Sequence, residues 1–498
     1  MRKSIAFGAG VLVGLFALAS VGCSSGKSEA KDDGPGPTPT EDAGNGGGNE
    51  AGPDTDGGLV ELPKPVLCPE TNLASPKLPN SVYIGDVVLK EDATWTADKI
   101  YLINDDFKIE NHKLTVEAGT TICLSNKGKI LVGQGIDPGE IHLNGTKEKP
   151  IVITAFPSNS DPKKPDAFHR GLQFDTYMAS TLSYVNIWYG GPGGGSASPA
   201  FETTTAGHGT DPKKPLLVDH LVIGAVQTRG IKIVNEAGID EASSIQFAGY
   251  VTPEPSGPAL SAVAELEISN IKSFAKVFNF AGAQIPDASK RVNLRIAQGE
   301  GMIQKDTDVV DFGLPFVLNN QLMVQITGPT DDPVGPTLTF HEGVKMMMSG
   351  VLKIGGIGQG NLVVQGTAAK PVIFTSNADA PAKGDWQGFQ FLDAHYDPAK
   401  TKIDHAEILY AGVDPSNPQQ WNQSVGRCGS NFVGAIMING NPYAQYDGPA
   451  ITNTKIAHSL SDGIVSYSSN TGGVLKTTYP TVTFDDIAGE KLRTAACP

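Results

Sequence analysis

The sequence predicts an all-β chain built as a solenoid from two homologous copies of one unit. Its 498 residues include 59 glycines and 35 prolines, which favour turns and short strands over long helices. From Tyr83 onward, short apolar runs alternate with Gly, Asn, Asp and Pro, and no long stretch shows helical periodicity. Many short strands with frequent turns suit a sandwich, a barrel or a solenoid.

An internal repeat favours the solenoid among these three architectures. Segments of residues 83–285 recur in the same order in residues 292–498, and matched segments lie 217 to 233 residues apart, so the length differences fall in loops. The matched pairs are LTVEAG from Leu114 with LTFHEG from Leu338, IHLNGTKEKPIVITA from Ile141 with LVVQGTAAKPVIFTS from Leu362, HRGLQF from His169 with WQGFQF from Trp386, LSYVNIWYGG from Leu182 with IDHAEILYAG from Ile403, and VDHLVIGAVQTRGIKI from Val218 with ITNTKIAHSLSDGIVS from Ile451.

These motifs resemble the right-handed parallel β-helix repeats of bacterial surface proteins, the pectin-lyase-like architecture. The resemblance covers nearly all of residues 83–498, and it is specific for fold rather than for function. It implies coils that bury Ile and Val inward, with Gly and Asn at the corners and a cap at each end. The second copy has the fuller motif at Gly384–Trp386, whereas the first copy has Ala167–His169 there.

The first 22 residues have the pattern of a signal peptide. Arg2 and Lys3 precede an apolar stretch that ends in small residues. The following Ser20–Cys23 resembles a bacterial lipobox, although Ser20 stands where Leu is commonest, and the resemblance implies a lipid on Cys23. Ser24 is not the Asp that retains lipoproteins of enteric bacteria at the inner membrane, so the implied location is the outer membrane. The alternative is ordinary secretion, with Cys23 left free or removed.

Residues 23–63 are predicted to be the lipidated cysteine and a disordered tether. The segment is acidic, rich in Gly, Pro and Asp, and nearly devoid of large apolar residues, so it cannot offset its ordering entropy by burial. We expect the first half of the solenoid, with its cap, over 64–290 and the second half over 291–498. The net charge of −15 argues against nucleic acid as a partner.

Four cysteines besides Cys23 suggest two disulfides in an exported chain. They allow three pairings, and the pairing within each half is favoured, which joins Cys68 to Cys123 and Cys428 to Cys497. The sequence has no CxxC motif and no Cys/His cluster, so we predict no metal and no cofactor.

Some β-helix proteins cleave polysaccharides with several carboxylates and an Arg or Lys on one face. Acidic residues in the second copy are Asp385, Asp393, Asp404 and Glu407, and their counterparts in the first copy are not acidic. No paired carboxylate motif stands out. We therefore predict no catalytic residue, and enzymatic activity stays the less favoured alternative.

Long loops follow the matched strands at Gly191 and Gly412, and we expect such insertions to lie on the same face of a solenoid. The second copy concentrates aromatic, amide and charged residues in or beside its loops, which suits carbohydrate or protein recognition. In an alternative interpretation, Asp385 caps a turn and Trp386 packs against the coil. The candidate ligand-binding residues are Asp385, Trp386, Trp421, Asn422, Arg427, Tyr443 and Tyr446.

The sequence thus predicts a cell-envelope lipoprotein, held at a membrane by its lipid, that presents a β-helix for binding or adhesion. A polysaccharide or a surface protein is the expected partner. Two alternatives stay open: a polysaccharide lyase or glycoside hydrolase, and a structural spacer.

Overall fold

In the computed structural model, the described strands run from Ser81 to Ala496. The predicted signal peptide, Cys23 and tether lie outside the described residues. No described helix is long and apolar enough to span a membrane. The structure describes residues 63–70, 76–85, 88–192, 198–203, 216–227, 229–233, 239–240, 242–250, 262–266, 277–279, 293–296, 301–326, 334–392, 395–413, 433–440, 447–468 and 477–496.

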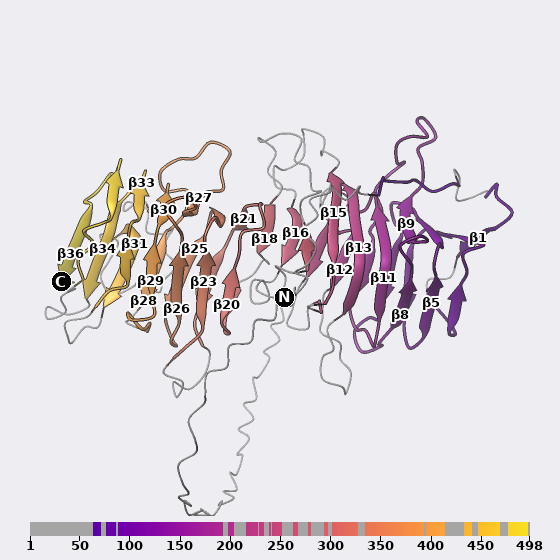
Figure 1. Cartoon of the computed structure of the whole chain (residues 1–498), viewed down its shortest axis with the longest axis horizontal. Coiled ribbons are helices and arrows are strands. Elements are labelled where there is room, and N and C mark those ends of the chain that lie inside the picture. Colours follow the sequence, from indigo (N-terminus) through magenta and orange to yellow (C-terminus); the bar gives the residue numbers. More distant parts are fainter. Residues whose placement is uncertain are drawn as a thin grey trace, which may run out of the picture. The chain divides into compact units, whose positions relative to one another are not determined.

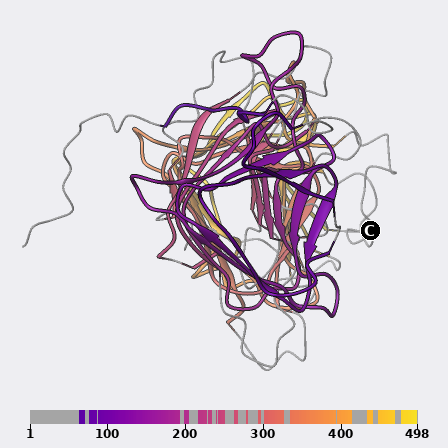
Figure 2. The same ribbon diagram turned by 90° about the vertical axis from the view of Figure 1, so that its right-hand side faces the viewer.

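The described elements are short strands, and each strand pairs in parallel with the equivalent strand of the next coil. The strands stack side by side along the unit (Figure 1) and surround a common interior (Figure 2). This arrangement confirms the predicted right-handed parallel β-helix.

The first copy begins with an 11-stranded sheet that forms two faces of the coils. One face contains β1 (Ser81–Ile84), β3 (Ile100–Ile103), β6 (Thr121–Leu124), β9 (Ile151–Ala155), β11 (Thr181–Trp188), β13 (Leu217–Val226), β15 (Ile245–Tyr250) and β17 (Phe278–Asn279). The other face contains β2 (Ala93–Trp95), β5 (Lys113–Glu117) and β8 (Glu140–Asn144), which pairs with β11.

A 13-stranded sheet runs through both copies and joins them. Its strands are β4 (Asp106–Ile109), β7 (Lys129–Val132), β10 (Leu172–Phe174), β12 (Phe201–Thr203), β14 (Ile231–Ile233), β16 (Ala262–Leu266), β18 (Asn293–Ile296), β21 (Phe316–Leu318), β24 (Lys345–Met348), β27 (Val372–Ser376), β30 (Ala406–Leu409), β33 (Lys455–Ala457) and β35 (Thr483–Asp485).

Two further sheets complete the coils of the second copy. One contains β19 (Gly301–Ile303), β22 (Gln321–Val324), β25 (Val351–Gly355), β28 (Phe389–Leu392), β31 (Gly434–Gly440), β34 (Asp462–Ser468) and β36 (Leu492–Ala496). The other contains β20 (Thr307–Val309), β23 (Thr337–His341), β26 (Asn361–Gln365), β29 (Lys402–Asp404) and β32 (Ala450–Thr452).

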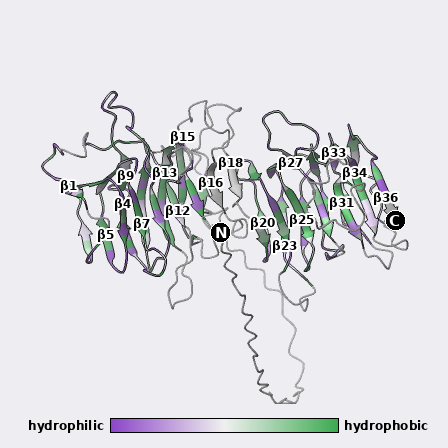
Figure 3. Ribbon diagram, turned by 180° about the vertical axis from the view of Figure 1, so that it is seen from behind, coloured by the Kyte–Doolittle hydropathy of each residue, from purple (hydrophilic) through white to green (hydrophobic). Residues whose placement is uncertain are grey.

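The core is one continuous cluster of inward-facing apolar side chains from both copies. In β5, for example, Leu114 and Val116 are fully buried while the residues between and beside them are not. Leu114 stacks on Ile141 of the next coil. Figure 3 shows hydrophobic residues, in green, along many of the strands. Full burial of one such side chain contributes roughly 1.5–3 kcal/mol, and only a stack of coils can supply it.

The corners of the coils show the repeat at the level of the backbone. Four matched pairs of non-glycine residues have positive φ in both copies: Tyr184 with His405, Tyr189 with Tyr410, His220 with Asn453, and Ala225 with His458. Among the described residues, thirteen glycines and two asparagines have positive φ, as expected, whereas Tyr, His and Ala occupy seven of these eight matched positions. Aromatic stacking between coils offsets part of the conformational cost of about 1–2 kcal/mol per residue. Tyr184 stacks on His220 at 4.3 Å and Tyr410 on His458 at 4.9 Å.

The second copy is stacked on the first with a shift of one face. By the sequence repeat, β6 and β24 are equivalent, yet β6 belongs to the 11-stranded sheet and β24 to the 13-stranded sheet. The shift occurs where β18, the first strand of the second copy, pairs with β16 rather than with β17. The strands that precede the two long loops, β11 and β30, consequently lie in different sheets. Most residues of these loops lie outside the described residues, so their placement on one face stays a prediction.

The structure contains the predicted disulfide between Cys68 and Cys123. Cys428 and Cys497 lie outside the described residues, so their pairing stays a prediction.

Candidate functional site

A surface pocket of about 530 Å³ lies on the first copy. Four connections supply its walls: the turn between β6 and β7, the loop between β9 and β10, and the segments that follow β11 and β13. We call it the Arg170 pocket. Its lining residues are Asn126, Pro165, Asp166, Ala167, Phe168, Arg170, Pro192 and Gln227.

The loop between β9 and β10 is held at both ends. At its start, Phe156 is buried beside the disulfide. Across its neck, the backbone N–H of Asp166 donates to the carbonyl of Phe156 at 2.8 Å, and the N–H of Ser158 donates to the carbonyl of Lys164 at 2.8 Å. A loop fixed in this way presents its side chains in a defined geometry.

His169 anchors the end of the same loop. Its side chain is fully buried, Nε2 lies 2.9 Å from the carbonyl oxygen of Trp188, and Nδ1 accepts the backbone N–H of Gly171 at 3.0 Å. These partners require the neutral tautomer with its proton on Nε2. Burial lowers the pKa of His169 to about 4, and the bond to Trp188 opposes this shift. His169 is therefore a structural anchor rather than a group that exchanges protons with a ligand near neutral pH.

The second copy has Trp386 in the same role. Its indole Nε1 donates to the carbonyl of Leu409 at 2.8 Å. Leu409 is the repeat partner of Trp188, so both rings reach the same carbonyl of the coil unit. His169 also forms a parallel β-bridge with Gly190, and Trp386 forms the equivalent bridge with Ala411. The repeat thus preserves an inward ring with one N–H donor, although the residue type changes.

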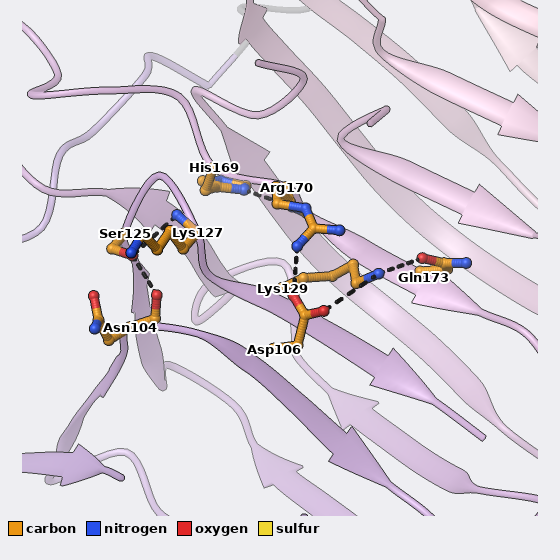
Figure 4. Close-up of polar contacts among 9 residues, drawn as sticks. Asn104, Asp106, Ser125, Lys127, Lys129, His169, Arg170 and Gln173 are labelled. Atoms are coloured by element: carbon orange, nitrogen blue, oxygen red, sulfur yellow. Dashed lines mark hydrogen bonds and ion pairs between the residues drawn. The ribbon is translucent and has the colours of Figure 1, made fainter. Parts of the chain in front are cut away.

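Below the pocket, alternating charges cross adjacent coils on the outer side of the 13-stranded sheet (Figure 4). Arg170 Nη1 donates to Asp106 Oδ1 at 2.8 Å, and Lys129 Nζ lies 3.9 Å from Asp106 Oδ2. Lys129 also donates to Gln173 Oε1 at 2.8 Å. Arg170 Nε is buried and has no hydrogen-bond partner in the described part of the chain. Arg170 is thus oriented from below by Asp106 while its donors are only partly used.

Two further coils continue this charged row. Glu202 pairs in register with Gln173, and Lys232 donates to Glu202 at 2.9 Å. The Lys129 side chain is largely buried, and desolvation lowers its pKa, opposed by the nearby carboxylate of Asp106. Of the residues in this row, only Arg170 lines the pocket.

The upper part of the pocket combines an aromatic ring with amides. Phe168 is half-buried and packs edge-on against Tyr189 at 6.4 Å. Asn126 and Gln227 add side-chain amides to the lining. A ring face beside amides and an Arg can stack on a sugar and hydrogen-bond its hydroxyls.

The equivalent place in the second copy is closed. Leu460 is the repeat partner of Gln227, and Gly384 is the repeat partner of Ala167. A Cβ atom added at Gly384 would lie only 2.4 Å from the side chain of Leu460. Gln387 replaces Arg170. The N–H of Arg170 donates to the carbonyl of Gly128, and the N–H of Gln387 donates to the carbonyl of Gly350, so these two glycines are equivalent. With the glycines aligned, the turn of the second copy is two residues shorter and has no counterpart of Asn126.

The two predicted ligand contacts within the described residues serve the fold. Trp386 is 1 % exposed and packs edge-on against Phe389, so it cannot stack on a sugar, and its assignment as a ligand contact is wrong. Asp385 accepts hydrogen bonds from the hydroxyl of Ser376 and the backbone N–H of Ala382, which is the turn-capping role. Both residues thus agree with the alternative interpretation, in which Asp385 caps a turn and Trp386 packs against the coil.

Five other predicted contacts lie outside the described residues, and they stay predictions: Trp421, Asn422, Arg427, Tyr443 and Tyr446. Phe168 and Arg170 were not predicted as site residues, because the first copy matches the repeat motif less fully than the second copy does. The different residues at Ala167–His169, where the second copy has Gly384–Trp386, could have indicated a different local surface in the first copy.

Of the acidic residues considered for catalysis, Asp385, Asp404 and Glu407 lie on or beside different strands. Asp404 ends β29 and accepts hydrogen bonds from Thr452 and Asn453, and the pKa of this carboxyl is lowered although burial opposes the shift. Glu407 lies on β30 and Asp393 is outside the described residues. Within the described ranges, no group of three His, Cys, Asp or Glu side chains is placed to hold a metal ion.

A family model agrees with the β-helix fold over part of the chain. Residues 313–416 match the family model described as "Pectate-lyase like beta helix domain". A comparison with curated proteins finds no significant match. Among solved structures, the surface protein and adhesin PfbA of Streptococcus pneumoniae is 11 % identical, with a TM-score of 0.15 over 79 % of this chain and 91 % of that chain. The chain therefore has a parallel β-helix fold, and its residues 313–416 are similar to the pectate-lyase-like β-helix family.

Proposed function

We propose that the chain is a cell-envelope adhesion protein that binds glycan in the Arg170 pocket and is held at the membrane by a lipid on Cys23. The observation that supports the binding role is the pocket itself, where Phe168, Arg170 and two amides meet on rigidly held connections. The β-helix architecture is compatible with a surface-adhesion role.

Arg170 is the group to test first. Arg170→Gln gives the first copy the residue that Gln387 supplies in the second. Hydrogen bonds to a charged group contribute about 1.5–3 kcal/mol, so we expect the affinity for glycan to fall about 30-fold. The measurement is binding of the full exported chain to a glycan array, followed by titration calorimetry with the ligand found.

Gln387→Ala is the matched control, and it is expected to bind as the wild type does. Equal binding by wild type and Arg170→Gln would refute the pocket as the glycan site. Absence of any glycan ligand would refute the glycan-binding role. Cleavage of the bound glycan would replace that role with a carbohydrate-active enzyme.

The anchor is tested separately. Cys23→Ser is expected to move the protein from the membrane fraction to the soluble fraction, because one or two acyl chains supply the proposed attachment. A variant that still fractionates with membranes would contradict the lipid anchor.

A further inference from the structure

The chain enters the β-helix through a strap that lies across the outside of the coils. The strap comprises residues 63–70. The hydroxyl of Thr154 donates to the carbonyl of Val66 at 2.6 Å, and the N–H of Cys68 donates to the carbonyl of Ala155 at 2.9 Å. The strap therefore contacts β9, although it precedes the first strand, β1, in the sequence.

A small apolar cluster fixes the strap to the outward face of the sheet. In β3, Tyr101 and Ile103 point to the main core, while Ile100 and Leu102 point outward. The outward pair is buried with Cys68, Cys123 and Phe156. The disulfide thus lies within a packed contact between the strap and β3, β6 and the start of the pocket loop.

The first coil, by contrast, is weakly held. The strand β1 pairs only with β3 in the described structure, and its residues are half-buried or exposed, whereas all four residues of β3 are buried. The strand β2 likewise pairs only with β5. A terminal strand with one hydrogen-bonded neighbour is the first to separate when the chain is pulled from its N-terminal side.

We propose that the Cys68–Cys123 disulfide is a mechanical clip that transmits tension from the N-terminal chain directly to β6. The chain between the two cysteines, which contains β1 to β5, then bears no load. The biological use of such a clip rests on the proposed anchor at Cys23, since an anchored body is pulled through this segment whenever a bound ligand moves. The mechanical property itself does not depend on the anchor.

Single-molecule pulling tests the clip. The exported chain, with Cys23→Ser to remove a competing thiol, is attached by ligated handles at its two ends. The cysteines lie 55 residues apart, so the segment between them corresponds to about 190 Å of extended chain. The Cys68→Ser/Cys123→Ser variant is expected to release about this length in a first event at lower force than any event of the wild type.

Two outcomes would overturn the clip. One is a double variant whose first event occurs at the wild-type force and releases no such length. The other is fast hydrogen exchange of residues 81–95 in the unloaded double variant, which would make the disulfide a requirement for folding rather than a clip. If the variant does not fold, wild type folded first and then treated with a phosphine reductant is pulled instead, with the same two criteria. Failure of the clip would leave the anchor intact, because membrane fractionation measures it independently.

Discussion

The two copies of the coil unit place different residues around the same buried anchor. In the first copy, His169 reaches the carbonyl of the next coil, and Phe168 and Arg170 beside it line a pocket. In the second copy, Trp386 makes the equivalent bond, and Leu460 fills the space. Both copies keep an inward ring whose N–H donates to the same carbonyl of the coil unit. The flanking positions are free to form either a pocket or a closed surface.

The shift of one face between the copies adds to this difference. Because β18 pairs with β16, equivalent loops of the two copies follow strands of different sheets. A ligand that contacts one face of the solenoid therefore does not meet two equivalent sites. This difference agrees with the proposal that the first copy alone binds the ligand.

The largest expected effect comes from removing the anchor of the second copy. Trp386→Ala leaves a cavity in the core, and such substitutions cost about 3–5 kcal/mol. Denaturant unfolding should show this loss, while the glycan affinity of the folded protein stays unchanged. Trp386→Phe, which keeps most of the volume, should cost much less. A selective loss of glycan affinity in Trp386→Ala, without a loss of stability, would restore Trp386 as a ligand contact.

The anchor of the first copy should make stability depend on pH. Burial lowers the pKa of His169 to about 4 in the folded protein, below the usual value of about 6.5 for a histidine in water. The unfolded chain therefore binds the proton more readily between these values, so stability is fully present above pH 6.5 and decreases as the pH falls to 4, by about 3 kcal/mol.

His169→Gln is the control, because Gln does not titrate. The difference in unfolding free energy between wild type and this variant should change over pH 4 to 6.5 and stay constant below pH 4. A difference that is independent of pH would contradict the buried neutral imidazole.

Filling the pocket should convert the first copy to the closed form of the second. Gln227→Leu introduces the residue that Leu460 supplies at the equivalent position. We expect glycan affinity to fall about tenfold, or about 1.4 kcal/mol, with little change in stability. Leu460→Gln is the matched exchange in the second copy and should leave affinity unchanged. Tight binding by Gln227→Leu would show that the ligand does not enter the pocket.

The smallest expected effect is that of the aromatic face. Phe168→Ala removes a stacking surface whose interaction is about 1 kcal/mol, so affinity should fall about fivefold. Asp385→Ala changes the matched residue of the second copy and should not alter affinity, although it removes a turn cap. Unchanged affinity in Phe168→Ala would remove stacking from the account of the site.

The fold could be predicted because its determinants are local and periodic. Inward residues such as Leu114 and Ile141 recur in both copies, and the pairing of Cys68 with Cys123 follows from the assignment of cysteines to halves. The shift of one face could not be predicted, because the repeat does not state which strand of the first copy receives β18.

The inward position of Trp386 and the Arg170 pocket could not be predicted for a related reason. The sequence showed Trp386 as an aromatic residue beside a loop, but whether its ring points inward depends on the register of the coil. The opening at Arg170 depends on Gln227 and on a turn two residues longer, and both lie far from Arg170 in the sequence. Their proximity appears only when successive coils are stacked.

Hydrogen–deuterium exchange with and without bound glycan tests the central claim most directly, because it compares both copies in one unmodified protein. The account predicts that the ligand protects the segments around 126–128 and 165–172, while the equivalent segments around 349–351 and 382–389 exchange unchanged. Protection in the second copy, or protection in neither, would contradict the assignment of binding to the first copy.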